Sequence, residues 1–174
     1  MSIKWRRRFA RVIVALLVGV LAGCAHTIVS DPDTFNVPAD AAKHLRAGGN
    51  VALNNAYQAE TKVTFFRGES VSWIADLKQY TDTAITMLGR EMQKKSVAVD
   101  PKAAKTVTLR VYGLSVVGSG AVLILEAQYG DGTKSTIKSQ GTSQWTTWGM
   151  VDHSLMIAVS RLLDSYKFQA YVNN

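Results

Sequence analysis

The chain has 174 residues, 47% of them hydrophobic, and a formal net charge of +7. Five of its twenty basic residues precede residue 24 whereas all thirteen acidic residues follow it, so residues 24–174 carry a net charge of only +2. This near-neutral remainder has no basic cluster with interleaved aromatics, which argues against a nucleic-acid-binding surface. A single cysteine excludes an internal disulfide, and the length indicates one domain with its own core.

The N-terminal segment has the layout of an export signal. Its bases are Lys4, Arg6, Arg7, Arg8 and Arg11. An uncharged run over residues 12–25 follows directly, and a basic start with a short apolar run is typical of a signal peptide. About 20 apolar residues are needed to cross a bilayer as a helix, so this run is too short for a comfortable permanent anchor.

The apolar run closes on Leu21, Ala22, Gly23 and Cys24, which resembles the lipobox of bacterial lipoproteins. The resemblance implies that a diacylglycerol group is attached to the Cys24 thiol, that the chain is cut between Gly23 and Cys24, and that the new amino end is acylated. Ala25 in place of an aspartate implies sorting to the outer membrane, by the pattern of enteric bacteria. The alternatives for this segment are an uncleaved signal anchor and a catalytic thiol, but no base and orienting group accompany Cys24.

Residues 24–36 mix Asp, Pro, Ser and Asn without periodicity, and we expect a lipidated tether with a reach of about 35 Å. Pro38 and the Gly48–Gly49 pair predict a short helix over residues 37–49. Residues 50–58 and 61–68 are β-prone. An apolar stripe that starts at Ile74 predicts an amphipathic helix over 72–95, with Ser72 as its N-cap.

Three strands are predicted next, over residues 105–117, 121–129 and 133–145, joined by Gly-rich hairpin turns. The second is apolar on both faces, as in a central strand, and Lys134 and Lys138 give the third the character of an exposed edge. A helical stripe begins near Thr147, and residues 167–172 are expected to close the chain as a short strand.

Together these elements predict an α+β two-layer sandwich, in which an antiparallel or mixed sheet of four to five strands carries two main helices on one face. The domain organisation we expect is a signal peptide over 1–23, a lipidated tether over 24–36 and a single periplasmic domain over 37–174. This order behind a lipobox resembles the small periplasmic α/β lipoproteins, which include the auxiliary lipoproteins of lipid-trafficking ABC transporters and the plug lipoprotein of lipopolysaccharide assembly. The resemblance implies a role in binding a partner.

Few residues suggest chemistry. His26, His44 and His153 are scattered, and Asp152 and His153 are adjacent on a helix, where neighbouring side chains diverge. The sequence therefore predicts no catalytic residues, no metal site and no cofactor. Glu126 interrupts an apolar strand, and it either faces solvent on an uncovered sheet face or lies in a ligand cleft.

Five large aromatics at element junctions form either core or a protein interface: Phe65, Phe66, Trp73, Trp145 and Trp148. The leading functional hypothesis is a non-catalytic accessory or structural subunit of a cell-envelope assembly for transport, secretion or motility, held at the periplasmic face of the outer membrane. The alternative is a periplasmic carrier of lipid or another small ligand. The sequence leaves the oligomeric state open.

Overall fold

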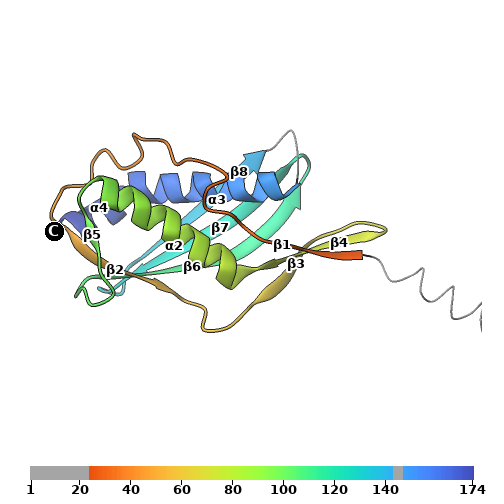
Figure 1. Cartoon of the computed structure of the whole chain (residues 1–174), viewed down its shortest axis with the longest axis horizontal. Helices are drawn as coiled ribbons and strands as arrows, with labels where there is room; N and C mark the ends of the chain where they lie inside the picture. The colour runs from red at the N-terminus through yellow and green to blue at the C-terminus, as the bar shows by residue number, and fades with distance from the viewer. Residues whose placement is uncertain (1–23, 143–146) are drawn as a thin grey trace, which may run out of the picture.

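The computed structural model describes residues 24–142 and 147–174, which form two sheets and three helices (Figure 1). In chain order the elements are β1 (Cys24–Ile28), β2 (Asn50–Asn55), β3 (Lys62–Arg67), β4 (Val71–Asp76), α2 (Leu77–Lys94), β5 (Ala98–Val99), β6 (Thr106–Val117), β7 (Gly120–Tyr129), β8 (Lys134–Thr142), α3 (Thr147–Asp164) and α4 (Tyr166–Asn173). The signal peptide predicted over residues 1–23 lies outside the described residues.

The larger sheet has five strands in the order β5-β2-β6-β7-β8. The pairs β2–β5 and β2–β6 are parallel, whereas β6–β7–β8 form the expected antiparallel meander with β7 inside and β8 at the edge. Helix α2 packs against β2 and β6, and α3 packs against β7 and β8, on the same side of the sheet (Figure 1). The predicted α+β class, with a mixed sheet under two helices, is therefore confirmed.

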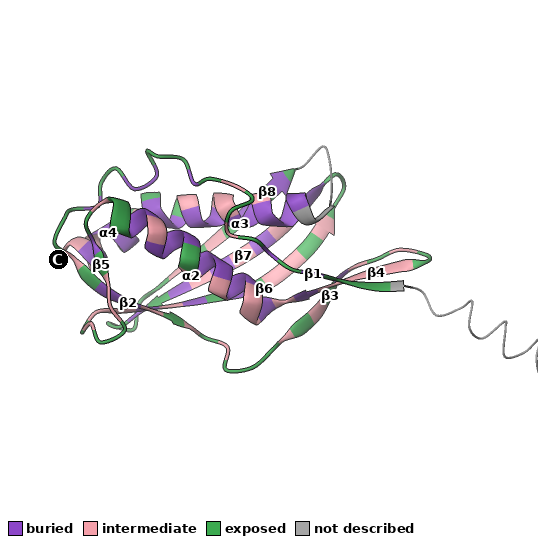
Figure 2. Cartoon of the chain, in the orientation of Figure 1, coloured by how far each residue is buried: buried purple, intermediate pink, exposed green. Residues whose placement is uncertain are grey.

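The core lies between this sheet and the two helices (Figure 2). On β6, Val107, Leu109 and Val111 are fully buried, whereas the alternate residues Arg110 and Tyr112 are exposed. Period-two alternation turns every second side chain towards the helices. Burying these apolar side chains supplies most of the driving force for the fold.

Two side-chain hydroxyls connect the helices to the sheet through hydrogen bonds. On α2, Thr81 accepts a hydrogen bond from the Val111 N–H at 3.0 Å, next to the β-bulge in β6. On α3, Ser154 accepts from the Gly141 N–H at 2.8 Å and donates to the Ala121 carbonyl at 2.6 Å. Gly141 allows this close approach, because a Cβ there would lie 2.6 Å from the Met150 carbonyl oxygen.

One predicted helix is absent from the described residues, and the predicted start of another is wrong. Residues 37–49 form a series of turns rather than a helix, because their hydrogen bonds join residues three apart, as from Ala41 to Pro38. The helix expected to start at Ser72 starts at Leu77, and Asp76 is its N-cap. The β-branched and aromatic residues of Val71–Asp76 favour the strand β4 instead.

The chain also ends differently from the prediction. Residues 167–172 lie in α4, not in a strand, and Ser165 caps this helix by accepting a hydrogen bond from the Phe168 N–H at 3.3 Å. Burial of Phe168 and Val172 shows why the apolar pattern was ambiguous, since a short apolar run fits a buried strand or a buried helix equally well.

The tether expected over residues 24–36 is not free in the structure. Cys24–Ile28 form β1, which pairs in parallel with β4, and Ile28 and Ser30 are buried. The following residues lie across both long helices. The polar residues that suggested a linker form hydrogen bonds to the rest of the domain instead.

We predict that Gly141→Ala destabilises the domain by about 1 to 3 kcal/mol or more, because the added methyl overlaps the backbone of α3. Gly89→Ala is the matched control: its Cβ would meet only Leu53 and Val99, at 3.7 and 3.8 Å, and alanine favours a helix by up to about 1 kcal/mol. Urea unfolding followed by circular dichroism measures both. Equal free energies of unfolding for the two variants would contradict the close contact between Gly141 and the backbone of α3.

Candidate interface at the N-terminal arm

The second sheet projects from the body as an arm, which we define as β1, β3 and β4 (Figure 1). Strand β4 is central, with β1 parallel on one side and β3 antiparallel on the other. Cys24 pairs with Val71 at the outer end, beside the β3–β4 turn at residues 68–70, and Ile28 pairs with Ala75 near the body. The first described residue therefore lies at the tip of the arm.

Three of the five predicted interface aromatics meet on this arm. The rings of Phe65 and Phe66 lie 6.3 and 5.2 Å from the ring of Trp73, centroid to centroid. A register shift between Thr64 and Phe66 places both phenylalanines against the same tryptophan. Phe65 is buried and belongs to the core, whereas Phe66 and Trp73 are half-buried.

The other two aromatics cannot be assigned to core or interface. Trp145 lies outside the described residues, and Trp148 lies in α3 with a side chain that is likewise outside them. The sequence named Phe65, Phe66 and Trp73 among five aromatics, but it did not separate Phe65, which is buried, from the two that retain exposed surface.

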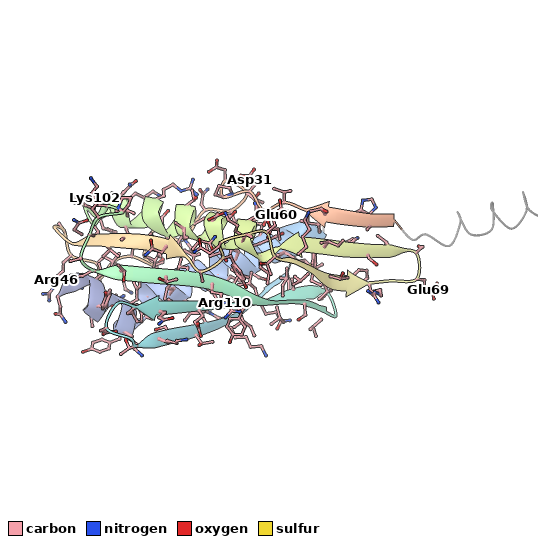
Figure 3. All side chains as sticks on the ribbon, turned by 90° about the horizontal axis from the view of Figure 1, so that it is seen from below. Asp31, Arg46, Glu60, Glu69, Lys102 and Arg110 are labelled. Atoms are coloured by element: carbon pink, nitrogen blue, oxygen red, sulfur yellow. The ribbon has the colours of Figure 1, made fainter. Side chains whose placement is uncertain are left out.

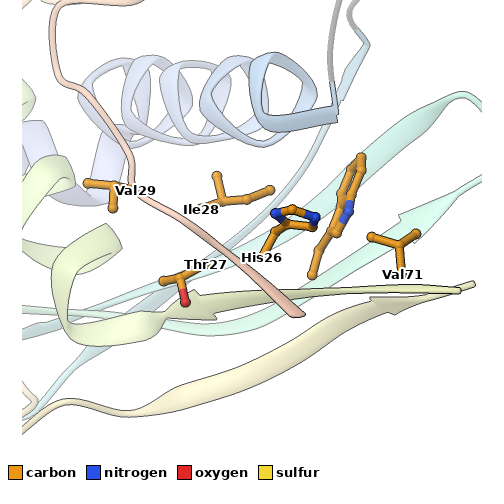
Figure 4. A pocket seen from close by; sticks show the side chains of 6 residues that line it. His26, Thr27, Ile28, Val29 and Val71 are labelled. Atoms are coloured by element: carbon orange, nitrogen blue, oxygen red, sulfur yellow. The ribbon is translucent and has the colours of Figure 1, made fainter. Parts of the chain in front are cut away.

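An open cleft of about 550 Å³ lies next to Trp73, with His26, Thr27, Ile28, Val29 and Val71 as its other lining residues (Figure 4). His26 and Ile28 project into it from β1, and Val71 lines it from β4. Most of these side chains are apolar. The cleft can accept an apolar chain or ring, and among its described lining residues His26 and Thr27 have polar side chains and Trp73 has an indole N–H.

Residues 29–37 follow β1 and cross both long helices, and we call this segment the strap. Ser30 exchanges two hydrogen bonds with the Gln79 side chain of α2, at 3.0 and 2.6 Å. Its hydroxyl donates to the Asp152 carboxylate of α3 at 2.7 Å. Further along, Arg90 binds the Asp33 carboxylate, so the strap ties the base of the arm to α2 and α3.

Asp152 is the one strongly perturbed carboxyl of the described residues. It is 5% exposed, and burial raises its pKa to about 6, although the Ser30 hydrogen bond favours the charged form. The neighbouring Tyr80 is fully buried, its hydroxyl has no hydrogen-bond partner within the described residues, and burial followed by the nearby Asp152 charge raises its pKa. This polar cluster is closed off from solvent.

The histidines do not converge. His26 lines the cleft, His44 lies in an exposed turn, and His153 stacks on Phe35 of the strap at 5.3 Å between ring centroids. The Nδ1 atom of His153 contacts the Thr142 carbonyl oxygen at 2.6 Å, whereas the Asp152 carboxylate accepts a hydrogen bond from the Ser30 hydroxyl. Within the part of the chain that the structure describes, no group of three or more His, Cys, Asp or Glu residues could hold a metal ion.

The sheet face turned away from the helices carries a polar and aromatic cluster that the sequence analysis missed (Figure 3). The Arg110 guanidinium lies over the rings of Tyr57 and Tyr112, at 5.6 and 5.9 Å from their centroids. On the same face Glu126 forms an ion pair with Lys134 at 3.3 Å. Glu126 is thus on the uncovered side of the sheet. We call this surface the open face.

No family model matches the chain, and no curated protein matches it. Among solved structures, it is similar to the crystal structure of a Xanthomonas campestris protein of the family DUF330. The two share 12% sequence identity with a TM-score of 0.47, over 86% of this chain and 95% of the other. Among the described residues, no helix has the length and apolar character required to cross a bilayer.

We predict that ionisation of Asp152 lowers the stability of the fold as the pH rises from about 4 to about 6. The pKa of Asp152 in the folded protein lies above its ordinary value, so the folded state is favoured when this carboxyl is protonated and is disfavoured as it ionises. A pKa difference of about two units between the folded and unfolded states changes the free energy of unfolding by no more than about 3 kcal/mol. Asp152→Asn keeps an acceptor for Ser30 and should remove most of this fall.

Urea unfolding of both proteins between pH 4 and pH 7 measures the effect. Asp164→Asn, on the exposed side of α3, is the control and should keep the wild-type pH profile. An unchanged pH profile in D152N would show that this carboxyl is not the cause.

Proposed function

We propose that the protein is a lipoprotein, acylated at Cys24 and held at the periplasmic face of the outer membrane, that acts as a non-catalytic accessory subunit of an envelope assembly. The observation that carries the proposal is the order of features before Cys24: five bases, a short apolar run, and Leu21, Ala22 and Gly23 directly before the thiol. Two or three acyl chains make such anchoring effectively permanent, at about 0.8 kcal/mol for each buried methylene.

The residue after the cysteine adds to this proposal. Ala25 follows the cysteine, which supports sorting to the outer membrane rather than retention at the inner one.

We infer binding rather than catalysis. Tyr80 and Asp152, which have the largest pKa shifts of the described residues, and Ser30, which is bonded to Asp152, are buried, and the described clefts are lined by other side chains. A substrate could not reach them without local opening. The open face, in contrast, presents Arg110 between two tyrosines, and Arg and Tyr are enriched among residues that dominate protein interfaces.

The second candidate function is a carrier of lipid or another small ligand. The cleft beside Trp73 favours it, since its volume of about 550 Å³ lies within the usual range of ligand pockets, roughly 300 to 1,000 Å³. Its partly apolar lining suits an acyl chain.

Cys24→Ser should abolish incorporation of labelled palmitate and release the protein from the membrane fraction, because a hydroxyl does not replace the thiol as the acceptor of the lipid. Cell fractionation and mass spectrometry of the purified protein measure both. Ala25→Ser, which leaves the cysteine in place, is the control and should remain acylated. An unmodified Met1 start, or a membrane-bound C24S protein, would contradict the proposal.

Native mass spectrometry of the gently extracted protein separates the two candidates. As an accessory subunit it should appear with a protein partner at fixed stoichiometry, and Tyr112→Ala on the open face should dissociate that complex without unfolding the domain. As a carrier it should appear with bound lipid, which Trp73→Ala should remove. A bare monomer in both cases would contradict both functions, and circular dichroism checks that each variant is folded.

A further inference from the structure

We propose that the arm is the membrane-facing end of the domain, with the β3–β4 turn at the level of the lipid headgroups. This inference rests on the proposed acylation of Cys24. It adds an orientation, because the residue that would carry the lipid is part of a strand and not of a flexible linker.

The pairing of β1 with β4 leaves no flexible segment between the proposed lipid anchor at Cys24 and the domain. Cys24 is in register with Val71, and paired strands lie about 5 Å apart. Glu69 in the turn is two residues before Val71 in the chain, which adds about 7 Å at most. The headgroup layer is roughly 5 to 8 Å deep on each side of the hydrocarbon, so an anchor at Cys24 places the turn in this layer or directly beside it.

The strap keeps this geometry fixed. Immediately after β1, Ser30 is bonded to Gln79 of α2 and to Asp152 of α3, and these contacts are buried or half-buried. Detaching β1 to create a longer tether would break its ladder with β4 and expose Ile28. An acyl anchor therefore holds the whole domain by the arm.

The surface of the arm suits contact with lipid. On the arm itself Trp73 and Val71 are half-buried beside the cleft, and Val29 of the strap, which lines the cleft after β1, is 69% exposed. Tryptophan is favoured at the boundary between an apolar phase and water. Near the turn, Arg67 and Glu69 are exposed with opposite charges, so the contact should depend on the anchor and on apolar side chains rather than on anionic lipid.

The other end of the molecule must then point into the aqueous compartment. Lys102 and Arg46 lie at the end opposite to Glu69 (Figure 3), and the C-terminus of α4 is at that same far end (Figure 1). This separation makes the orientation measurable, since labels at the two ends should report different environments.

The experiment uses the single native cysteine to advantage, because acylation of Cys24 leaves an introduced cysteine as the only free thiol. Glu69→Cys and Lys102→Cys, both at exposed positions, are purified as full lipoproteins, labelled with one fluorophore and reconstituted into phosphatidylethanolamine–phosphatidylglycerol vesicles. A fraction of the lipids carries a nitroxide quencher near the headgroup. Ser70→Cys, also exposed and in the same turn, is the second test position.

We expect the labels at positions 69 and 70 to lose most of their fluorescence on reconstitution with quencher lipids, and the label at 102 to lose almost none. Two checks show first that the protein is anchored: it floats with the vesicles, and its mass includes the acyl chains. If both checks succeed, equal quenching at 69 and 102, or no quenching at 69 and 70, overturns the orientation. The proposed anchoring then still stands. A protein that lacks the acyl mass and does not float overturns the anchoring, and the orientation with it.

Discussion

The parallel pairing of β1 with β4 is the interaction on which the rest of the candidate site depends. Without β1, the arm would be a two-stranded hairpin, which has marginal stability on its own in water. The pairing also builds the cleft, since β1 provides three of its lining residues and β4 provides two. Because β1 ends at Ile28, it delivers Ser30 to the junction of α2 and α3, where the strap is bound.

The strap binds through polar contacts that carry an electrostatic cost. A carboxyl that is 5% exposed loses most of its hydration, and the Ser30 hydroxyl and the Asp31 backbone N–H replace only part of it. Apolar contacts add to the attachment, since Phe35 stacks on His153 and Val37 is buried. The segment is therefore held by many modest interactions whose positions are specified by hydrogen-bond geometry. Such an attachment defines where the strap lies more strongly than it stabilises the fold.

The sequence predicted what depends on periodicity and missed what depends on tertiary contact. Alternation in Val107, Leu109 and Val111 identified β6, and the helical stripe that begins near Thr147 identified α3. The strand at Val71–Asp76 was hidden because Ile74 also fits the stripe of the helix that follows. In residues 24–36 the only local strand signal is the short β-branched run of Thr27, Ile28 and Val29, and β1 forms as a partner of β4. Ser30 and Asp152, which form a buried pair, are 122 positions apart.

The anchoring and the partner binding that we propose would use different surfaces of this fold. The strands of the larger sheet and both long helices extend along the length of the molecule, with the arm at one end (Figure 1). If the arm meets the membrane, the open face with Arg110 and Tyr112 stands away from the bilayer along the side of the domain. A partner could then cover Tyr57, Arg110 and Tyr112 without displacing lipid from the arm. Since β1 and the strap fix the arm to the helices, such a partner would be held at a defined height and angle relative to the membrane, which a flexible tether could not provide.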